Sequence, residues 1–239
     1  MKRIIIFCLV LFISFGCSQQ DENTSMQDKK IYEFSWCSYK DGFKAQDLNN
    51  ELISYLGFLG NLKDQHGLYK VTKYLDPSFN QQKYDFSWLD IFENELEKKA
   101  FHEFAKKSEI HKNWLSSKDE IIVCDSQKQT FYETIIVDDY EFQDGDQTYL
   151  GFCKLKDGFE FNYLMPQIRS NPIFVDRPYN LAFLIPDFEM IDFNFLVYLE
   201  TNLVTNELDL IQKNKLDNAC KEYENFSANS LLFNTYIID

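Results

Sequence analysis

The segment Cys37-Ser-Tyr-Lys-Asp-Gly-Phe43 recurs as Cys153-Lys-Leu-Lys-Asp-Gly-Phe159, and this repeated block decides how the chain is divided. Five of its seven positions are identical, and each block follows a short aromatic run, Tyr32 to Trp36 and Tyr149 to Phe152. In both places the aromatic run predicts a strand and Asp-Gly predicts a turn. The recurrence indicates an internal repeat, with one structural unit in each half of the chain.

The first half, residues 31–137, predicts the element order β-α-β-β-α-β. Residues 45–60 carry leucines at helical spacing. A second helix is expected to begin after Asn94, a plausible N-cap, and to end at Trp114. The expected strands are Tyr32–Cys37, Leu68–Leu75, Tyr84–Phe92 and Thr130–Val137. This order is that of the ferredoxin-like unit.

The second half, residues 148–239, repeats the order after an acidic linker at 138–147. Two helices are expected, a short one at Tyr163–Ile168 broken by Pro166 and a longer one at Glu207–Tyr223. The expected strands are Gly151–Cys153, Asn180–Leu184, Ile191–Glu200 and Leu231–Ile238. The middle two strands are apolar on both faces and need cover on each side. Helices can cover one face, so the sheet of the sister repeat is expected to cover the other.

The predicted fold is therefore α+β, with two tandem ferredoxin-like repeats packed sheet to sheet as a fused α+β barrel. In a ferredoxin-like sheet the first and last strands are antiparallel neighbours. Cys37 ends the first strand and Cys124 precedes the last, while Cys153 and Cys220 hold the matching places in the second half. We predict disulfides Cys37–Cys124 and Cys153–Cys220. Four free thiols are the alternative.

The N-terminus predicts export. Lys2 and Arg3 precede an apolar run that ends at Gly16-Cys17, so residues 1–17 have the plan of a signal peptide. A cysteine after a small residue resembles the lipobox of bacterial lipoproteins, in which Cys17 would be lipidated, and residues 18–30 would form a polar tether. Ordinary signal-peptidase cleavage is the alternative. We expect a protein held by its lipid at the periplasmic face of a bacterial membrane, or else a soluble periplasmic or secreted one.

The charge excludes nucleic acid as a partner. Without the signal peptide the chain has 22 basic and 38 acidic residues, and its arginines are Arg169 and Arg177. Nucleic acids and anionic headgroups require clustered Lys and Arg. The 23 Phe and 14 Tyr residues provide ample material for a core.

Two ferredoxin-like units packed sheet to sheet resemble the dimeric α+β barrel superfamily, here fused in one chain. The aromatic-Cys strand, the Asp-Gly turn and Cys124-Asp-Ser126 also resemble an uncharacterised group of secreted, repeat-containing bacterial proteins. The barrel resemblance implies either a cofactor-free monooxygenase or haem-handling enzyme, or a plain binding protein. Enzymes of the superfamily place an aromatic pocket between sheet and helices. Pocket candidates by this resemblance are Trp36, Asp85, Trp88 and His66.

The pocket candidates also have ordinary structural explanations. Large aromatics on strands are ordinary core packing, and His66 suits a turn. His102 and His111 lie on an amphipathic helix and are expected to face solvent. Asp85 and Asp90 are five positions apart, which places them on opposite faces of a strand.

No catalytic pattern, metal-ligand spacing or cofactor motif occurs in the sequence, so no catalytic residue, metal or cofactor is predicted. We expect a non-catalytic envelope lipoprotein that binds a small apolar ligand or a protein partner. A cofactor-free monooxygenase or haem-handling enzyme is the alternative, and a scaffold without a ligand is a third possibility.

Overall fold

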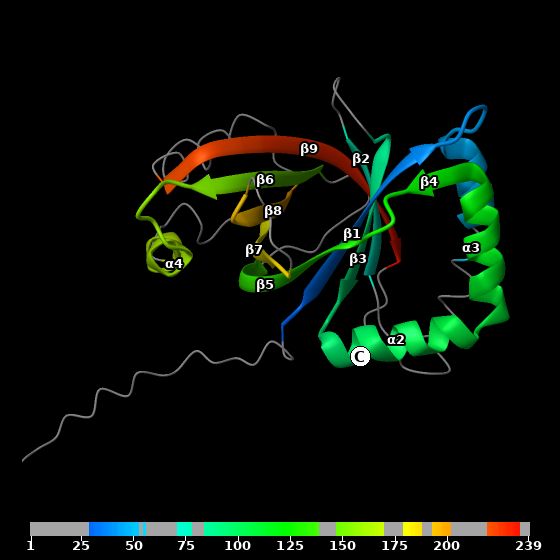
Figure 1. The fold of residues 1–239 in the computed structure, drawn as a ribbon, viewed down its shortest axis with the longest axis horizontal. Helices are drawn as coiled ribbons and strands as arrows, with labels where there is room; N and C mark the ends of the chain where they lie inside the picture. Colours follow the sequence, from blue (N-terminus) through cyan, green and yellow to red (C-terminus); the bar gives the residue numbers. More distant parts are fainter. Residues whose placement is uncertain are drawn as a thin grey trace, which may run out of the picture.

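The computed structural model describes residues 29–52, 55, 71–77, 84–138, 147–169, 179–187, 193–201 and 219–234 (Figure 1). Its strands in the first half are β1 (Ile31–Tyr39), β2 (Val71–Pro77), β3 (Phe86–Phe92), β4 (Ile122–Cys124) and β5 (Gln129–Asp138). Those in the second half are β6 (Gln147–Leu155), β7 (Tyr179–Pro186), β8 (Phe195–Thr201) and β9 (Cys220–Asn234). The described helices with both ends placed are α2 (Glu95–Lys107), α3 (Glu109–Ile121) and α4 (Phe161–Arg169).

The strands form two ferredoxin-like sheets that join at both edges. In the first half the order is β2-β3-β1-β5, with the short β4 beside the C-terminal end of β1. In the second half it is β7-β8-β6-β9. Antiparallel pairs β2–β9 and β5–β7 connect the two sheets. The result is a closed β-barrel with helices outside it, as the sequence predicts (Figure 1).

Side chains of β1 alternate between the barrel interior and the helix-covered outer face, as the two-residue period of a strand requires. Tyr32 and Phe34 belong to the interior cluster, whereas Ile31 and Cys37 belong to the cluster beneath the helices of the first half. The interior is where the two sheets meet. Tyr32 of the first half packs there on Tyr198 of the second, with ring centroids 5.2 Å apart.

The single long helix predicted from Asn94 to Trp114 is two helices. Asn94 does cap α2, because its side chain accepts the backbone N–H of Glu97 at 3.0 Å. Ser108, in an extended conformation, ends α2 and caps α3 by accepting the N–H of His111 at 3.2 Å. The chain therefore turns between α2 and α3 (Figure 1). A serine at an N-cap satisfies a donor that the new helix leaves unpaired.

Two predictions for the second half are wrong in detail. The helix α4 is not broken at Pro166 but continues through it to Arg169. The predicted helix at Glu207–Tyr223 lies largely outside the described residues, and its end is wrong because Cys220 already begins β9. The last strand thus starts well before Leu231. Its length has a cause, since β9 pairs with β6 and then continues along β2 to join the two sheets.

The structure contains the two predicted disulfides. Cys37 is bonded to Cys124 with an S–S distance of 2.02 Å, and Cys153 to Cys220 at 2.03 Å. The first bond ties β1 to β4, and the second ties β6 to β9. Two disulfides are consistent with an oxidising compartment.

Other contacts also occupy matching places in the two halves. Asp85 accepts the backbone N–H of Tyr39 at 2.7 Å, and Asn194 accepts that of Leu155 at 2.8 Å. The two Asp-Gly turns have the same backbone as well: their glycines have φ of 88° and 86°, a region that favours glycine. Within the described ranges, no helix is long and apolar enough to cross a membrane.

Candidate functional site

A cavity of about 330 Å³ lies in the first half, between the outer face of the sheet and the helices. Its aromatic lining comes from four elements: Tyr55 from the helix that begins at residue 45, Trp88 from β3, Phe101 from α2 and Trp114 from α3. The rings of Tyr55 and Trp114 are stacked, with centroids 4.6 Å apart. The volume is at the lower end of the range of small-ligand pockets. The cavity can therefore hold a compound of one or two rings.

A cluster of charged groups lies at one side of this cavity, and its members Asp90, His102 and Lys128 line the cavity. Glu33 of β1 and Asp90 of β3 lie opposite each other in the sheet, with side chains 5 % and 7 % exposed. The Lys128 ammonium lies 3.1 Å from Glu33 Oε2 and 3.3 Å from Asp90 Oδ2. Lys98 Nζ is 3.2 Å from Glu33 Oε1, and His102 Nε2 is 3.6 Å from Glu33 Oε2. We call these five residues the charged cluster.

The cluster keeps Glu33 ionised. Burial alone would raise the pKa of this carboxyl, but the contact with His102 and the positive charges of Lys128 and Lys98 outweigh burial. The pKa of Glu33 falls to about 2. A group that is ionised throughout the neutral range is a fixed charge and a poor proton donor.

Unlike Glu33, Lys128 and Tyr55 keep their protons at neutral pH. Burial lowers the pKa of Lys128, but Asp90 and Glu33 raise it by more, so the ammonium stays charged. Burial and the nearby Asp90 raise the pKa of the Tyr55 hydroxyl far above its ordinary value. Glu33, Lys128 and Tyr55 therefore keep fixed protonation states at neutral pH and are poorly suited to proton transfer.

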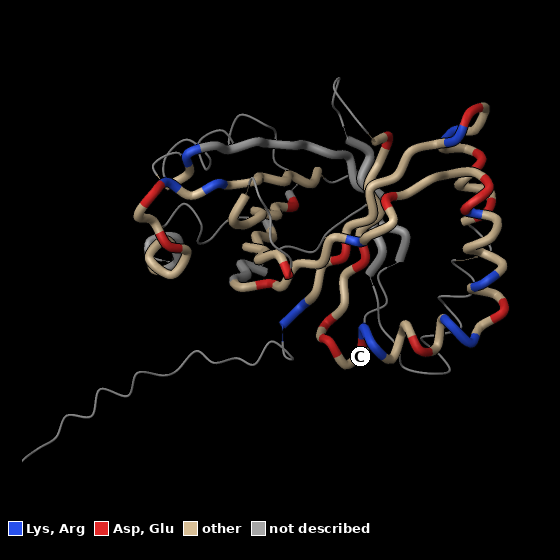
Figure 2. Tube along the Cα trace, viewed as in Figure 1, with Lys and Arg blue, Asp and Glu red and all other residues tan. Residues whose placement is uncertain are grey.

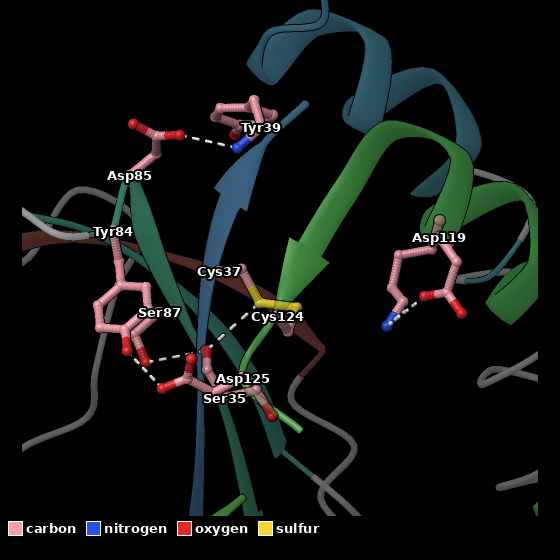
Figure 3. Close-up of a disulfide and its surroundings, with 10 residues drawn as sticks. Ser35, Cys37, Tyr39, Tyr84, Asp85, Ser87, Asp119, Cys124 and Asp125 are labelled. Carbon is pink, nitrogen blue, oxygen red and sulfur yellow. Dashed lines mark hydrogen bonds and ion pairs between the residues drawn. A yellow bond between two sulfur atoms is a disulfide. The ribbon is translucent and has the colours of Figure 1, made fainter. Parts of the chain in front are cut away.

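The disulfide Cys37–Cys124 forms another part of the cavity wall. Figure 3 shows it spanning β1 and β4, with Asp125 directly after it. The backbone N–H of Asp125 donates to the carbonyl of Trp36 at 2.9 Å, and its side chain accepts from the hydroxyl of Tyr84. These contacts hold the start of the segment that leads to Lys128.

The four predicted pocket residues do not come together. Trp88 lines the cavity. Trp36 lies on the other face of the sheet, against the barrel interior, and its Nε1 donates to Gln129 at 3.0 Å. Asp85 is exposed, precedes β3 and bonds the Tyr39 backbone instead. His66 lies outside the described residues.

The prediction that His102 and His111 face solvent is wrong. Both line the cavity: His102 contacts Glu33 of β1, and the ring of His111 packs against Tyr55 and Phe101. Sequence reasoning also missed Glu33 and Lys128, and it mentioned Asp90 only in relation to Asp85. A signal for Glu33 and Asp90 was present: each is a lone acid between large apolar residues of a strand, in Tyr-Glu-Phe and Leu-Asp-Ile.

The second half has no matching cluster in its described part. Aligning the two disulfides places Tyr149 at the position of Glu33, and the paired hydrogen bonds at β3 and β8 place Leu199 at that of Asp90. Both residues belong to an apolar core cluster.

Figure 2 shows acidic and basic positions interspersed along α2 and α3 of the first half.

Solved structures of similar fold come from several bacteria, whereas no family model and no curated protein sequence matches the chain. One, from Lactobacillus acidophilus NCFM and described as a "putative monooxygenase", is 10% identical, with a TM-score of 0.54 over 88% of this chain and 100% of its own. Another of that description, from Fusobacterium nucleatum subsp. nucleatum, is 11% identical, with a TM-score of 0.60 over 87% and 94%.

A chlorite dismutase variant from Candidatus Nitrospira defluvii is also similar, at 10% identity and a TM-score of 0.53 over 84% of this chain and 90% of its own. At such identities the similarity establishes the fold and nothing about chemistry. The fold of this chain, two ferredoxin-like sheets closed into one α+β barrel, is therefore the fold of these solved structures.

Proposed function

We propose that this protein binds a small, largely apolar molecule in the cavity of its first half, without catalysing a reaction. The observation that carries the proposal is the combination of an aromatic lining with fixed charges at one side. Such a mixture is the ordinary make-up of a small-molecule site. The apolar core at the matching positions of the second half, Tyr149 and Leu199, supports a ligand for the first half alone.

The test fills the cavity. Ser35 of β1 lines it, and the Ser35→Leu variant adds apolar volume there. The neutral two-ring dye 1-aminonaphthalene, whose emission shifts to shorter wavelength in apolar sites, is titrated against both proteins. We expect Ser35→Leu to weaken binding at least about tenfold. Val123→Leu is the matched control because Val123 is 55 % exposed and does not line the cavity. Equal binding by Ser35→Leu and the parent protein would overturn the proposal.

A cofactor-free monooxygenase is the second candidate. The observation in its favour is the fold shared with the Lactobacillus and Fusobacterium proteins. Oxygen consumption, followed with an electrode while two-ring phenols are added, separates the candidates. Binding without oxygen uptake supports the binding protein, and stoichiometric uptake with product formation supports the enzyme.

The described residues do not fit haem. His102 directs Nε2 at Glu33, and His111 packs between the rings of Tyr55 and Phe101. The cavity, at about 330 Å³, suits one or two rings rather than a porphyrin. A haemin titration that leaves the Soret band unshifted at micromolar haem is the expected result.

We further propose that the protein is exported and held at a bacterial membrane by a lipid on Cys17. The two disulfides support an oxidising compartment. The intact mass of protein extracted from membranes tests the anchor. A diacylglycerol-modified N-terminal cysteine is expected, and a plain N-terminus would show ordinary cleavage instead.

A further inference from the structure

We infer that the ligand is an uncharged, flat ring compound with an acceptor oxygen, such as a carbonyl, and that the Lys128 ammonium binds this oxygen. The inference rests on the proposed function, because it names the chemistry of the same cavity. It makes Lys128 the residue that determines specificity.

The Lys128 ammonium has more hydrogen-bond donors than the two carboxylates beside it use. An ammonium has three N–H donors. In the part of the chain that the structure describes, Lys128 Nζ has two acceptors, Glu33 Oε2 at 3.1 Å and Asp90 Oδ2 at 3.3 Å. Lys128 lines the cavity, and 42 % of its side chain is exposed. The third donor can therefore take an oxygen that arrives through the cavity.

The charges around Lys128 balance one another. Glu33 and Asp90 supply two negative charges, and Lys98 and Lys128 supply two positive ones, while His102 adds a charge only when it is protonated. A ligand carboxylate would lose its hydration and find no excess positive charge in return. A carbonyl oxygen loses far less on leaving water and still accepts the N–H. The balanced cluster thus favours a neutral acceptor over an anion.

The aromatic side chains that line the cavity suit a flat ring compound. Tyr55 and Trp114 stack with an interplanar angle of 12°, and the ring of Trp88 lies 6.2 Å from that of Trp114. Flat ring surfaces prefer to pack on one another in offset or edge-on arrangements. A compound of one or two fused rings can make these contacts while its oxygen reaches Lys128.

The experiment compares three probes with the same ring system: naphthalene, 2-acetonaphthone and 2-naphthoate. Their binding is measured by quenching of tryptophan fluorescence, since Trp88 and Trp114 line the cavity. We expect the ketone to bind about tenfold more tightly than naphthalene, the difference that one hydrogen bond from a charged donor makes. The carboxylate should bind more weakly than the ketone.

Variants then identify the donor. Lys128→Met should reduce the ratio of ketone to naphthalene affinity to about one, since it keeps the stem and removes the donor. Lys118→Met is the control because Lys118 also lines the cavity but pairs with Asp119 at 3.2 Å. Lys128→Met leaves Glu33 and Asp90 without their shared cation, so Lys128→Met/Asp90→Asn is made as well. The ratio is taken within one variant, so a reduced folded fraction cancels.

The outcomes separate the two proposals. If naphthalene and the ketone bind the parent protein equally, or if the ratio survives in Lys128→Met, the inference fails while the binding function stands. Tightest binding by the carboxylate overturns the charge argument and with it the inference. If no probe binds and 1-aminonaphthalene also fails, the proposed function itself is wrong.

Discussion

Glu33→Gln is the substitution that tests the charged cluster most directly. Its amide has nearly the shape of the carboxyl group and removes the charge that Lys98, His102 and Lys128 surround. Because the pKa of Glu33 falls from 4.5 to about 2 on folding, its ionisation stabilises the folded protein by about 3 kcal/mol at pH 7. Removing one partner of a buried ion pair costs a similar amount. We therefore expect Glu33→Gln to lower the free energy of unfolding by about 3 kcal/mol.

The pH dependence gives the sharper measurement. A carboxyl whose pKa is lowered on folding stabilises the protein above its unfolded pKa, and this stabilisation is lost as the pH falls from 4.5 toward 2. The difference between the parent protein and Glu33→Gln should shrink from about 3 kcal/mol at pH 7 to about 1.5 kcal/mol at pH 3. Urea unfolding of both proteins across this range, with the disulfides intact, measures the difference.

Glu103→Gln is the matched control, because Glu103 lies on α2 with 53 % of its side chain exposed and pairs with Lys106 on the surface. It should change the free energy of unfolding by less than about 0.5 kcal/mol at every pH. A difference for Glu33→Gln below about 1 kcal/mol at pH 7, or one that does not change with pH, would refute the account of the cluster.

Three other predictions concern local structure. Asn94→Ala removes the cap of α2 and should destabilise the protein by about 1 kcal/mol in urea unfolding, whereas Asn94→Asp should be near neutral. Gly42→Ala meets no neighbouring atom, so its expected cost of about 1 kcal/mol comes from the positive φ alone, and a thermal melt detects it. Cys37→Ala/Cys124→Ala opens a disulfide with a sequence separation of 87 and should cost about 4 kcal/mol and weaken dye binding in the cavity.

The second disulfide provides the control for the first. Cys153–Cys220 has a sequence separation of 67, so its double alanine variant should lose nearly as much stability, about 4 kcal/mol. It lies in the core of the second half, away from the cavity. Dye binding per folded molecule should therefore be unchanged. If both double variants lost the same amount of dye binding, the loss would reflect general destabilisation. The first disulfide would then have no specific role in positioning the cavity wall.

The barrel could be predicted because its determinants are local or periodic. The repeated Cys-x-x-Lys-Asp-Gly-Phe block, an aromatic strand before each copy and Asn94 before a helix are all signals of a few residues. The element order then selected the sheet topology. Ser108 was missed because one serine in an amphipathic stretch does not distinguish an interruption from a helical position. The early start of β9 was missed because Cys220–Tyr223 pairs with β6, a long-range contact with no local signature.

The site was harder to predict because its parts come from separated strands and helices. The charged cluster forms only when β1, β3 and α2 pack together, which brings Glu33, Asp90, Lys98 and Lys128 into contact. The spacing of these residues in the sequence does not predict that contact. Trp36, Asp85 and Trp88 were chosen as pocket candidates because of their residue types on predicted strands, and His66 because it lies between a predicted helix and strand. Of the two tryptophans among them, Trp88 faces the helices and Trp36 the barrel interior. The alternation of side chains along a strand predicts which residues share a face. It does not predict which of the two faces is covered by the helices.

The two halves share a backbone plan and differ in the chemistry of one face, and this difference is the strongest argument for where function lies. A core position occupied by Tyr149 in one half holds Glu33 in the other, and Leu199 corresponds to Asp90. Burying two carboxylates adds no stability over apolar packing unless every charge is matched. The first half supplies the matching charges, with Lys128 lining a cavity. A scaffold would need only the apolar version, so the charged version supports the proposal that the cavity of the first half takes a ligand.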